Sequence, residues 1–256
     1  MANKYKVVIQ FDGHGYFGWQ IQNQSSSSPT VQEIFNKALK VIFKEAIKTI
    51  ASGRTDTGVH SLAHHVVFEA PFEIPTEKLL RALNSNLPSS IRAIACEFVD
   101  EKFRPTYDAK DKEYRYFFSN KENQSPFTRH YMSNISYSLD LDLMEQACRL
   151  FVGTHDFKRF HCVGSQPSST TREIFEIQLF EEVACFNGII PEHYSIRIRG
   201  NGFLKQMVRL IVGAVWSVGR GKLSLSEIEL ALSCPNGEHV SAVAPPEGLF
   251  KFSVQY

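Results

Sequence analysis

The stretch Ala51–His60 reads ASGRTDTGVH and places one carboxylate, Asp56, between two glycines and two residues after an arginine. Gly53 and Gly58 can adopt backbone angles that are closed to other residues, so this segment can turn tightly and hold the Asp56 side chain outward. Arg54 supplies a neighbouring cation, which favours the ionised carboxylate that a nucleophile or a base needs. An ordinary surface turn has the same local pattern, so the function must be argued from the rest of the chain.

The bulk composition is that of a globular protein. The 256 residues are 43% hydrophobic, which is enough to bury the core of one large domain or two small ones. The N-terminus lacks the apolar core of a secretion signal, and the best apolar run, Leu210–Trp216, is far shorter than the roughly 20 residues of a membrane span. We therefore expect a cytoplasmic protein with no membrane partner.

The five scattered cysteines argue against a disulfide framework and predict reduced, mostly buried thiols.

The charge distribution gives a local sign of a nucleic-acid partner, although the net charge of +1 gives no general one. Residues 193–226 contain six lysines and arginines and no acidic residue. Such a stretch could follow a phosphate backbone, because each neutralised phosphate releases counterions. A solvated helix face with a loop is the alternative interpretation.

The pattern of the first half predicts strands and helices packed on one sheet. Residues 4–11 alternate between apolar and polar side chains, which is typical of a strand. Thr30 with Glu33 forms a capping-box pattern, and apolar residues then recur at helical spacing as far as Phe43. Further strands are predicted at 65–69 and 91–98, with a short helix between them beginning after residue 76.

The second half repeats this theme after a polar stretch, residues 103–112, that predicts a boundary. We divide the chain into an N-terminal half, residues 1–105, and a C-terminal half, residues 106–256. The predicted fold class is α+β, with two similar halves that each carry a mostly antiparallel sheet and helices on one face. In the second half the predicted strands are 113–118, 174–180, 194–199 and 249–254, and the predicted helices are 140–151, 204–218 and one beginning near residue 224.

The Asp56 stretch resembles the signature of tRNA pseudouridine synthases of the A type, and other motifs of that family follow in the same order. The resemblance runs from residue 11 to residue 249 and so covers nearly the whole chain. The matching stretches are FDGHGYFGWQ at 11–20, TVQ at 30–32, KEYRY at 112–116, GTHDF at 153–157, FLKQMVRLIVG at 203–213, VGRG at 218–221 and APPEGL at 244–249.

The resemblance implies a fold, a reaction and partners. Its fold joins the sheets of the two halves across a central catalytic cleft, with helices on the outer face. Its members are homodimers that isomerise uridines 38, 39 and 40 of the tRNA anticodon stem-loop to pseudouridine, without a metal or an organic cofactor. The N-terminal half would carry the catalytic aspartate loop, and the C-terminal half would carry a base-stacking tyrosine and an arginine.

Four residues form the predicted site. A carboxylate suits cleavage of the glycosidic bond, and Asp56 could add covalently to the nucleoside or remove a sugar proton. The resemblance implies that Arg54 fills the space left by the extruded uridine or grips the RNA backbone. Strand alternation puts Tyr114 and Tyr116 on one face as possible core residues, and the resemblance implies that Tyr114 stacks on the uracil. It also implies that Arg209 pairs with Asp56, which would lower the pKa of that carboxyl group.

Three other patterns compete with this site. His60 and His64 have the spacing of a zinc-binding helix, but Ser61 replaces the glutamate base and no third ligand is evident. Residues 219–222, GRGK, lack the upstream glycine and the hydroxyl residue of a nucleotide-phosphate loop. The pair at 155–156, His-Asp, could be catalytic, although a structural histidine is the simpler interpretation.

The chain also departs from the family pattern in two places. Thr106 stands where the family has an arginine, with Arg104 displaced upstream, and Ala63-His64 replaces a Gly-Gln pair. These departures leave the core chemistry untouched but affect expectations about RNA handling. Two rival functions remain: a non-catalytic RNA-binding protein on the same scaffold, and a glycosidase, which needs a second acid that residues 51–68 do not supply.

Overall fold

The computed structural model describes residues 3–22, 28–120 and 125–256. The chain divides into two compact units, which are described one at a time: unit 1 contains Met1–Lys110 and Lys251–Tyr256, and unit 2 contains Asp111–Phe250. The sequence placed its boundary between residues 105 and 106. The structure divides the chain between residues 110 and 111, and it returns the last six residues to unit 1.

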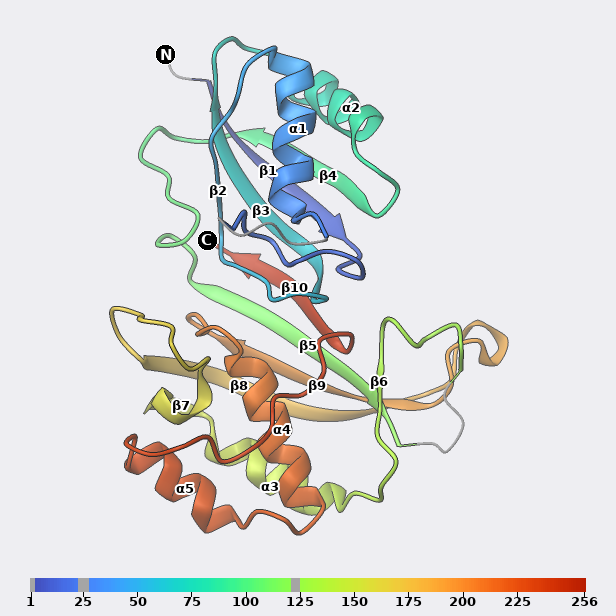
Figure 1. Ribbon diagram of the computed structural model, residues 1–256, viewed down its shortest axis with the longest axis vertical. Coiled ribbons are helices and arrows are strands. Elements are labelled where there is room, and N and C mark those ends of the chain that lie inside the picture. The colour runs from blue at the N-terminus through green and yellow to red at the C-terminus, as the bar shows by residue number, and fades with distance from the viewer. Residues whose placement is uncertain (1–2, 23–27, 121–124) are drawn as a thin grey trace. The chain divides into compact units, whose positions relative to one another are not determined.

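Unit 1 consists of a sheet with two helices packed on one face (Figure 1). Its elements are β1 (Asn3–Phe11), α1 (Val31–Phe43), β2 (Thr49–Ala51), β3 (His60–Ala70), α2 (Thr76–Asn86), β4 (Ile91–Phe98) and β10 (Leu249–Gln255). The strand order is β4-β1-β3-β10 with β2 beside β3, and β1 pairs antiparallel with both β3 and β4. Tyr5, Val7 and Ile9 alternate inward from β1 and form one core with the apolar face of α1.

Unit 2 has the same α+β character. Its elements are β5 (Asp111–Ser119), β6 (Ser133–Asn134), α3 (Leu141–Leu150), β7 (Gly153–Asp156), β8 (Thr171–Glu182), β9 (His193–Gly200), α4 (Met207–Gly219) and α5 (Leu225–Ser233), with short 3-10 turns at Lys158–Phe160 and Phe186–Gly188. The strands lie antiparallel in the order β5-β9-β8-β7, and β6 pairs parallel with β5. The predicted α+β class with mostly antiparallel sheets is confirmed.

The local start signals of the helices are also confirmed. Thr30 and Glu33 form both hydrogen bonds of a capping box before α1, and Ser224 and Glu227 do the same before α5.

All residues of α4 except Arg209 and Ser217 are buried. In the described ranges, 3–22, 28–120 and 125–256, every helix falls short of the length and apolarity that a membrane span needs.

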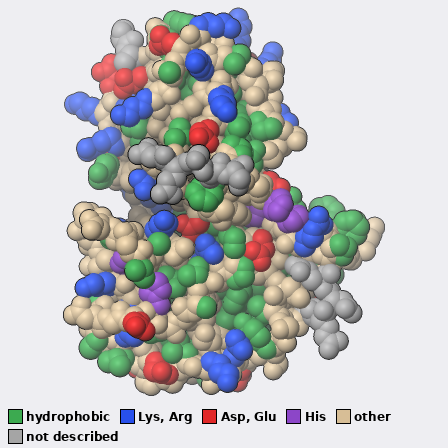
Figure 2. Space-filling view, in the orientation of Figure 1, with side chains coloured by type: hydrophobic (Ala, Val, Ile, Leu, Met, Phe, Trp, Pro, Cys, Tyr) green, Lys and Arg blue, Asp and Glu red, His purple; other side chains and the backbone are tan. Residues whose placement is uncertain are grey.

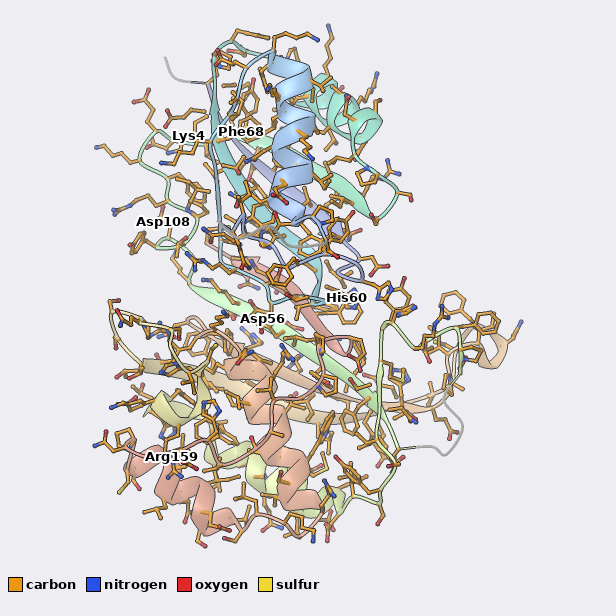
Figure 3. All side chains as sticks on the ribbon, viewed as in Figure 1. Lys4, Asp56, His60, Phe68, Asp108 and Arg159 are labelled. Carbon is orange, nitrogen blue, oxygen red and sulfur yellow. The ribbon has the colours of Figure 1, made fainter. Side chains whose placement is uncertain are left out.

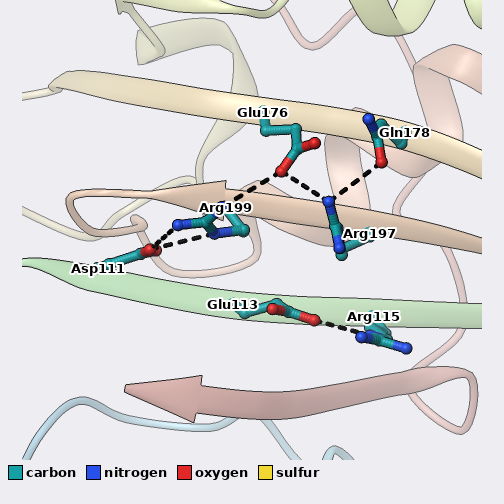
Figure 4. Close-up of polar contacts among 7 residues, drawn as sticks. All are labelled: Asp111, Glu113, Arg115, Glu176, Gln178, Arg197 and Arg199. Atoms are coloured by element: carbon teal, nitrogen blue, oxygen red, sulfur yellow. Dashed lines mark hydrogen bonds and ion pairs between the residues drawn. The ribbon is translucent and has the colours of Figure 1, made fainter. Parts of the chain in front are cut away.

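The face of the unit 2 sheet that Figure 4 shows carries paired charges. Arg199 binds Asp111 and also approaches Glu176, and Arg197 lies 2.7 Å from Glu176. Arg197 and Arg199 alternate with Ile196 and Ile198, whose side chains are fully buried on the opposite face. The acid-free stretch 193–226 therefore does not form one basic surface, because two of its six cations are neutralised by acids on neighbouring strands. Basic and acidic side chains are likewise interspersed over the molecular face in Figure 2.

The five cysteines are free, as predicted. Only Cys148 is buried, so the expectation of mostly buried thiols is wrong. Burial raises the pKa of the Cys148 thiol to about 12. Cys185 and Cys234 are exposed because they lie in loops that follow β8 and α5.

Candidate functional site

Asp56 lies in the loop that connects β2 to β3 (Figure 3). The carbonyl group of Asp56 accepts a hydrogen bond of 3.1 Å from the Val59 amide, which closes a turn. Gly58, with a φ of +78°, supplies the left-handed backbone angle within that turn. Asp56 is half-buried, while its neighbour Arg54 is exposed. Asp56 is thus partly accessible to solvent at this turn.

Residues 12–20 hold this loop through backbone contacts. A Cβ atom on Gly13 would lie 2.1 Å from the Val59 carbonyl oxygen, and one on Gly18 would lie 2.5 Å from the Thr55 carbonyl oxygen. The Trp19 amide donates to that same Thr55 oxygen at 3.2 Å. Two motifs that are far apart in the sequence therefore form one structural unit, and their glycines are required because the two backbones touch.

His60 fastens the end of the loop to the same segment. Its Nδ1 atom accepts a 2.9 Å hydrogen bond from the Gly13 amide and lies 3.2 Å from the Asp12 carboxylate. The amide contact requires an unprotonated Nδ1, whereas a salt bridge to Asp12 would require a protonated one. Because His60 and His64 lie in strand β3, they do not have the helical presentation of a zinc motif. Among the described residues, no group of three or more His, Cys, Asp and Glu could hold a metal ion.

A buried lysine that the sequence did not single out lies under the loop. Lys251 in β10 is fully buried, and its ammonium group donates a 2.5 Å hydrogen bond to the Ser52 hydroxyl at the start of the loop. Burial, followed by the charges of Lys251 and Lys6, lowers the pKa of His65 to about 4. His65 is therefore neutral at pH 7. Lysine is rarely buried, so composition and periodicity gave no signal for this contact.

The two departures from the family pattern lie close to the same loop. His64 is fully buried, and its ring packs against Trp19 with centroids 4.2 Å apart. Burial holds the pKa of His64 well below its usual range, so the neutral ring serves as a core aromatic. The Thr106 hydroxyl donates to the Ala51 carbonyl oxygen at 3.0 Å. Both residues thus support the Asp56 loop from within unit 1.

In unit 2, the two tyrosines of β5 have different surroundings. Tyr116 is fully buried, and its hydroxyl group bonds Ser133 and the Pro245 carbonyl oxygen, each at 2.7 Å. Burial raises the pKa of Tyr116 far above its ordinary value. Tyr114 is 9% exposed and meets Phe203 edge to face, with ring centroids 5.1 Å apart. Tyr116 is a core residue, whereas Tyr114 lies at the margin of the core.

Arg209 is positioned by a segment that wraps α4. The Arg209 Nε atom donates to the Ala244 carbonyl oxygen at 2.6 Å, and the Ala244 amide donates to the Arg209 carbonyl oxygen at 3.1 Å. A Cβ atom on Gly213 would lie 2.0 Å from the Ala242 carbonyl oxygen, and the Ser241 hydroxyl donates to the Leu210 carbonyl oxygen at 2.9 Å. The APPEGL motif therefore fixes the arginine of the FLKQMVRLIVG motif.

A family model described as tRNA pseudouridine synthase matches residues 7–108 and 147–256. The chain belongs to this family. The tRNA pseudouridine synthase A of Thermoanaerobacter sp. (strain X514) is 37% identical over 250 residues, which are 98% of each chain. The proteins of the same name from Bacillus pumilus (strain SAFR-032) and Bacillus subtilis (strain 168) are 37% and 35% identical and cover 99% and 98% of both chains. Among solved structures, the archaeal box H/ACA sRNP Nop10-Cbf5 complex covers 90% of this chain at 13% identity, with a TM-score of 0.36, which is too low to support any conclusion.

The predicted site residues of this family member fall in both units. Asp56 and Arg54 share one loop of unit 1, whereas Tyr114 and Arg209 belong to unit 2. The structure thus shows how each unit holds its own residues. The pairing of Asp56 with Arg209, and a cleft between the two sheets, remain predictions.

The other two motifs that the sequence offered as possible sites, at 155–156 and 219–222, have structural explanations. His155 places Nε2 3.1 Å from the Val152 carbonyl oxygen and packs edge to face on Phe157, while the Asp156 carboxylate accepts from the Lys158 amide at 3.0 Å. This histidine is therefore structural. The stretch 219–222 begins at the last residue of α4 and ends before the Ser224 N-cap of α5, so its lysine does not open a helix as the lysine of a phosphate loop does.

Proposed function

We propose that this protein isomerises uridines 38, 39 and 40 of the tRNA anticodon stem-loop to pseudouridine, with Asp56 as the reacting carboxylate. As a member of its family, the chain is an enzyme that forms pseudouridine in tRNA. The proposed role of Asp56 rests on the geometry of its loop. Asp56 is half-buried and lies in a turn whose backbone contacts Gly13, Gly18 and Trp19. A reacting group must be held within a fraction of an ångström, and backbone contacts provide that rigidity.

The reaction moves the sugar from N1 of the uracil to C5, so substrate and product have the same composition. No electrons are exchanged, and the protein needs to supply only positioning, a carboxylate and proton transfer. Asp56 either adds covalently to the nucleoside or removes a sugar proton as the glycosidic bond breaks, and both routes are consistent with an ionised carboxylate. Arg54, two residues away, places a cation in the same loop.

The other three residues have proposed roles that suit their surroundings. Arg54 is exposed and can reach an RNA backbone or the space that an extruded base leaves. Tyr114 lies at the margin of the core beside Phe203, and its aromatic ring is of the kind that stacks on a uracil. Arg209 is held by Ala244, so its guanidinium can pair with a carboxylate at little entropic cost. Such a pair would fix the orientation of the Asp56 carboxylate.

Tritium release from tRNA labelled at uracil C5 tests the reaction, with no metal or cofactor added. We expect release by the wild type and none by Asp56→Asn, which retains the size of the side chain. Asp100→Asn is the matched control, because Asp100 is an exposed carboxylate in another loop of unit 1, where it accepts a hydrogen bond from the Lys102 amide. Transcripts that carry uridine at only one of positions 38, 39 and 40 would assign the targets.

Two outcomes would contradict the proposal. Bound tRNA with no tritium release by the wild type would favour a non-catalytic RNA-binding protein, and free uracil as a product would favour a glycosidase. Equal activity of Asp56→Asn and wild type would exclude Asp56 as the reacting group. The homodimer that the family resemblance implies is a further proposal, and sedimentation velocity would test it.

A further inference from the structure

Two cations in unit 2 lie on the inner face of the sheet, and neither has an acidic partner among the described residues. Lys112 is only 9% exposed, and it lies two residues before Tyr114 on the same face of β5. The Arg172 guanidinium donates to the carbonyl oxygens of Ser169 and Thr171, at 3.0 and 2.6 Å. In the described part of the chain, neither cation has a carboxylate within salt-bridge distance.

The sheet register places these two cations on the same face, two strands apart. Lys112 pairs with Gly200 on β9, and Gly200 pairs in turn with Ile174 on β8. Arg172 precedes Ile174 by two residues in the strand, so its side chain leaves the sheet on the same face as that of Ile174. A Cβ atom on Gly202 would lie 3.9 Å from the Arg172 Nε atom. Burial, followed by the charge of Arg172, lowers the pKa of Lys112, which is consistent with this proximity.

The loop after β9 connects the two cations to the tyrosine that we propose stacks on the uracil. A Cβ atom on Gly200 would lie 2.6 Å from the Glu173 carbonyl oxygen and 3.3 Å from the Phe203 ring. Phe203 is the residue that meets Tyr114 edge to face. Lys112 and Tyr114 are about 7 Å apart along their strand, since two residues of a strand rise by that distance. The cations and the tyrosine therefore face the same region of unit 2.

The opposite face of the same sheet shows that unpaired cations are not a general feature of this unit. There Arg115, Arg197 and Arg199 each meet a carboxylate of their own or a neighbouring strand (Figure 4). A largely buried ammonium group without a counter-ion opposes folding, and a neighbouring guanidinium adds repulsion. An anionic ligand would remove both penalties, and a phosphate can accept from a lysine and an arginine together.

We propose that Lys112 and Arg172 form a binding site for one backbone phosphate of the tRNA, next to the nucleotide whose base Tyr114 contacts. The site rests on the proposed function for the identity of its ligand. The phosphate would supply the counter-charge that the described residues of unit 2 do not offer. It would also hold the backbone of the extruded nucleotide while the base is free to turn.

The salt dependence of tRNA binding by Lys112→Met tests this site. Methionine retains most of the apolar stem and removes the charge. We expect weaker binding by about tenfold at low salt, as for the loss of one charge-assisted contact. In a plot of log affinity against log salt concentration, we expect a slope that is shallower by about 0.7 to 0.9. Lys112→Arg restores the charge and should restore the slope, and Lys40→Met removes an exposed lysine of α1 as the matched control.

Thermal stability separates this role from a purely structural one. Removing a buried, unpaired cation should leave the melting temperature of Lys112→Met unchanged or higher. A lower melting temperature with a wild-type salt slope would overturn the proposal in favour of a structural lysine. If Lys112→Met does not fold, Arg172→Gln carries the test with the same expected slope, because Arg172 is only half-buried.

These experiments distinguish a failure of the phosphate-site proposal from a failure of the isomerase proposal. If the wild type released no tritium but Lys112→Met still had the shallower slope, the isomerase proposal would fail and the phosphate site would stand. If the wild type were active and Lys112→Met bound tRNA with wild-type affinity and slope, the phosphate site would be refuted and the isomerase proposal would stand.

Discussion

Substitution of Gly18 with alanine should displace the Asp56 loop, because Gly18 has both a restricted backbone angle and no space for a side chain. Its φ is +73°, and a Cβ atom would lie 2.5 Å from the Thr55 carbonyl oxygen, whereas ordinary van der Waals contact begins at 3.4 Å. The loop must therefore retreat by about 0.9 Å, the difference between these two distances. A misplacement of about 1 Å can cost about 100-fold in rate, so we expect kcat/KM to fall about 10- to 100-fold.

Gly15 provides the matched control, because its φ is +81° and no atom lies within 4 Å of its added Cβ. Alanine there brings only the left-handed backbone penalty, about 1 to 2 kcal/mol of unfolding free energy. Gly18→Ala adds the cost of overpacking, about 1 to 3 kcal/mol. Each kcal/mol corresponds to a melting shift of about 2 to 4 °C for a chain of this size.

Tritium release and thermal melting, measured on both variants, separate strain from displacement. We expect Gly15→Ala to retain nearly full activity with a small melting shift, and Gly18→Ala to lose activity as well as stability. Equal activities of the two variants would refute the reasoning, because they would show that contact with residues 12–20 does not set the position of Asp56.

Three further predictions concern the support of unit 1. Ser52→Ala removes a hydrogen-bond acceptor from the buried Lys251 ammonium group and should cost about 1 to 3 kcal/mol of unfolding free energy in urea titrations; no loss would show that the 2.5 Å contact is dispensable. The pKa of His65 is about 4 in the folded protein, against an ordinary value of 6.5. Between these two pH values the unfolded chain binds a proton that the folded protein does not. The free energy of unfolding should therefore fall by about 3 kcal/mol as the pH drops from 6.5 to 4. His65→Gln should flatten that pH dependence, and an unchanged curve would contradict the assignment. Thr30→Ala removes the side-chain acceptor of the capping box of α1 and should lower stability by about 1 kcal/mol, whereas Thr30→Ser should be nearly neutral; an equal loss in both variants would argue against the cap.

Local patterns predicted the elements that local chemistry determines. The alternation in β1 and the capping boxes at Thr30 and Ser224 depend on residues that are near in sequence, and the structure has both. The short strands β2, β6 and β7 were missed because two to four residues carry no period, and their partners alone make them strands. The strand predicted at 65–69 begins at His60, since pairing with β1 extends it through polar residues.

The tight loop around Asp56 was predictable from the sequence, whereas the contacts that support it were not. The glycines around Asp56 indicated a tight loop, which the structure confirms. That residues 12–20 hold the loop could not be deduced from spacing, because the contact is between backbones. Lys112 and Lys251 were not recognised as buried, because lysine is ordinarily exposed and their burial depends on sheet register. Sheet register also places Arg197 and Arg199 beside acidic residues of neighbouring strands, which the acid-free stretch 193–226 did not reveal.

The return of residues 251–256 to unit 1 has a consequence for how the protein matures during synthesis. Domains generally fold as they emerge from the ribosome, N-terminal first. Unit 1 does not follow that order, since β3 lacks its neighbour β10, and Ser52 lacks the Lys251 ammonium group, until residues 251–256 have been made. The loop that carries Asp56 is therefore completed only after all of unit 2 has been synthesised, although its own residues are made early. The support of the reacting carboxylate thus depends on a strand made about 200 residues later.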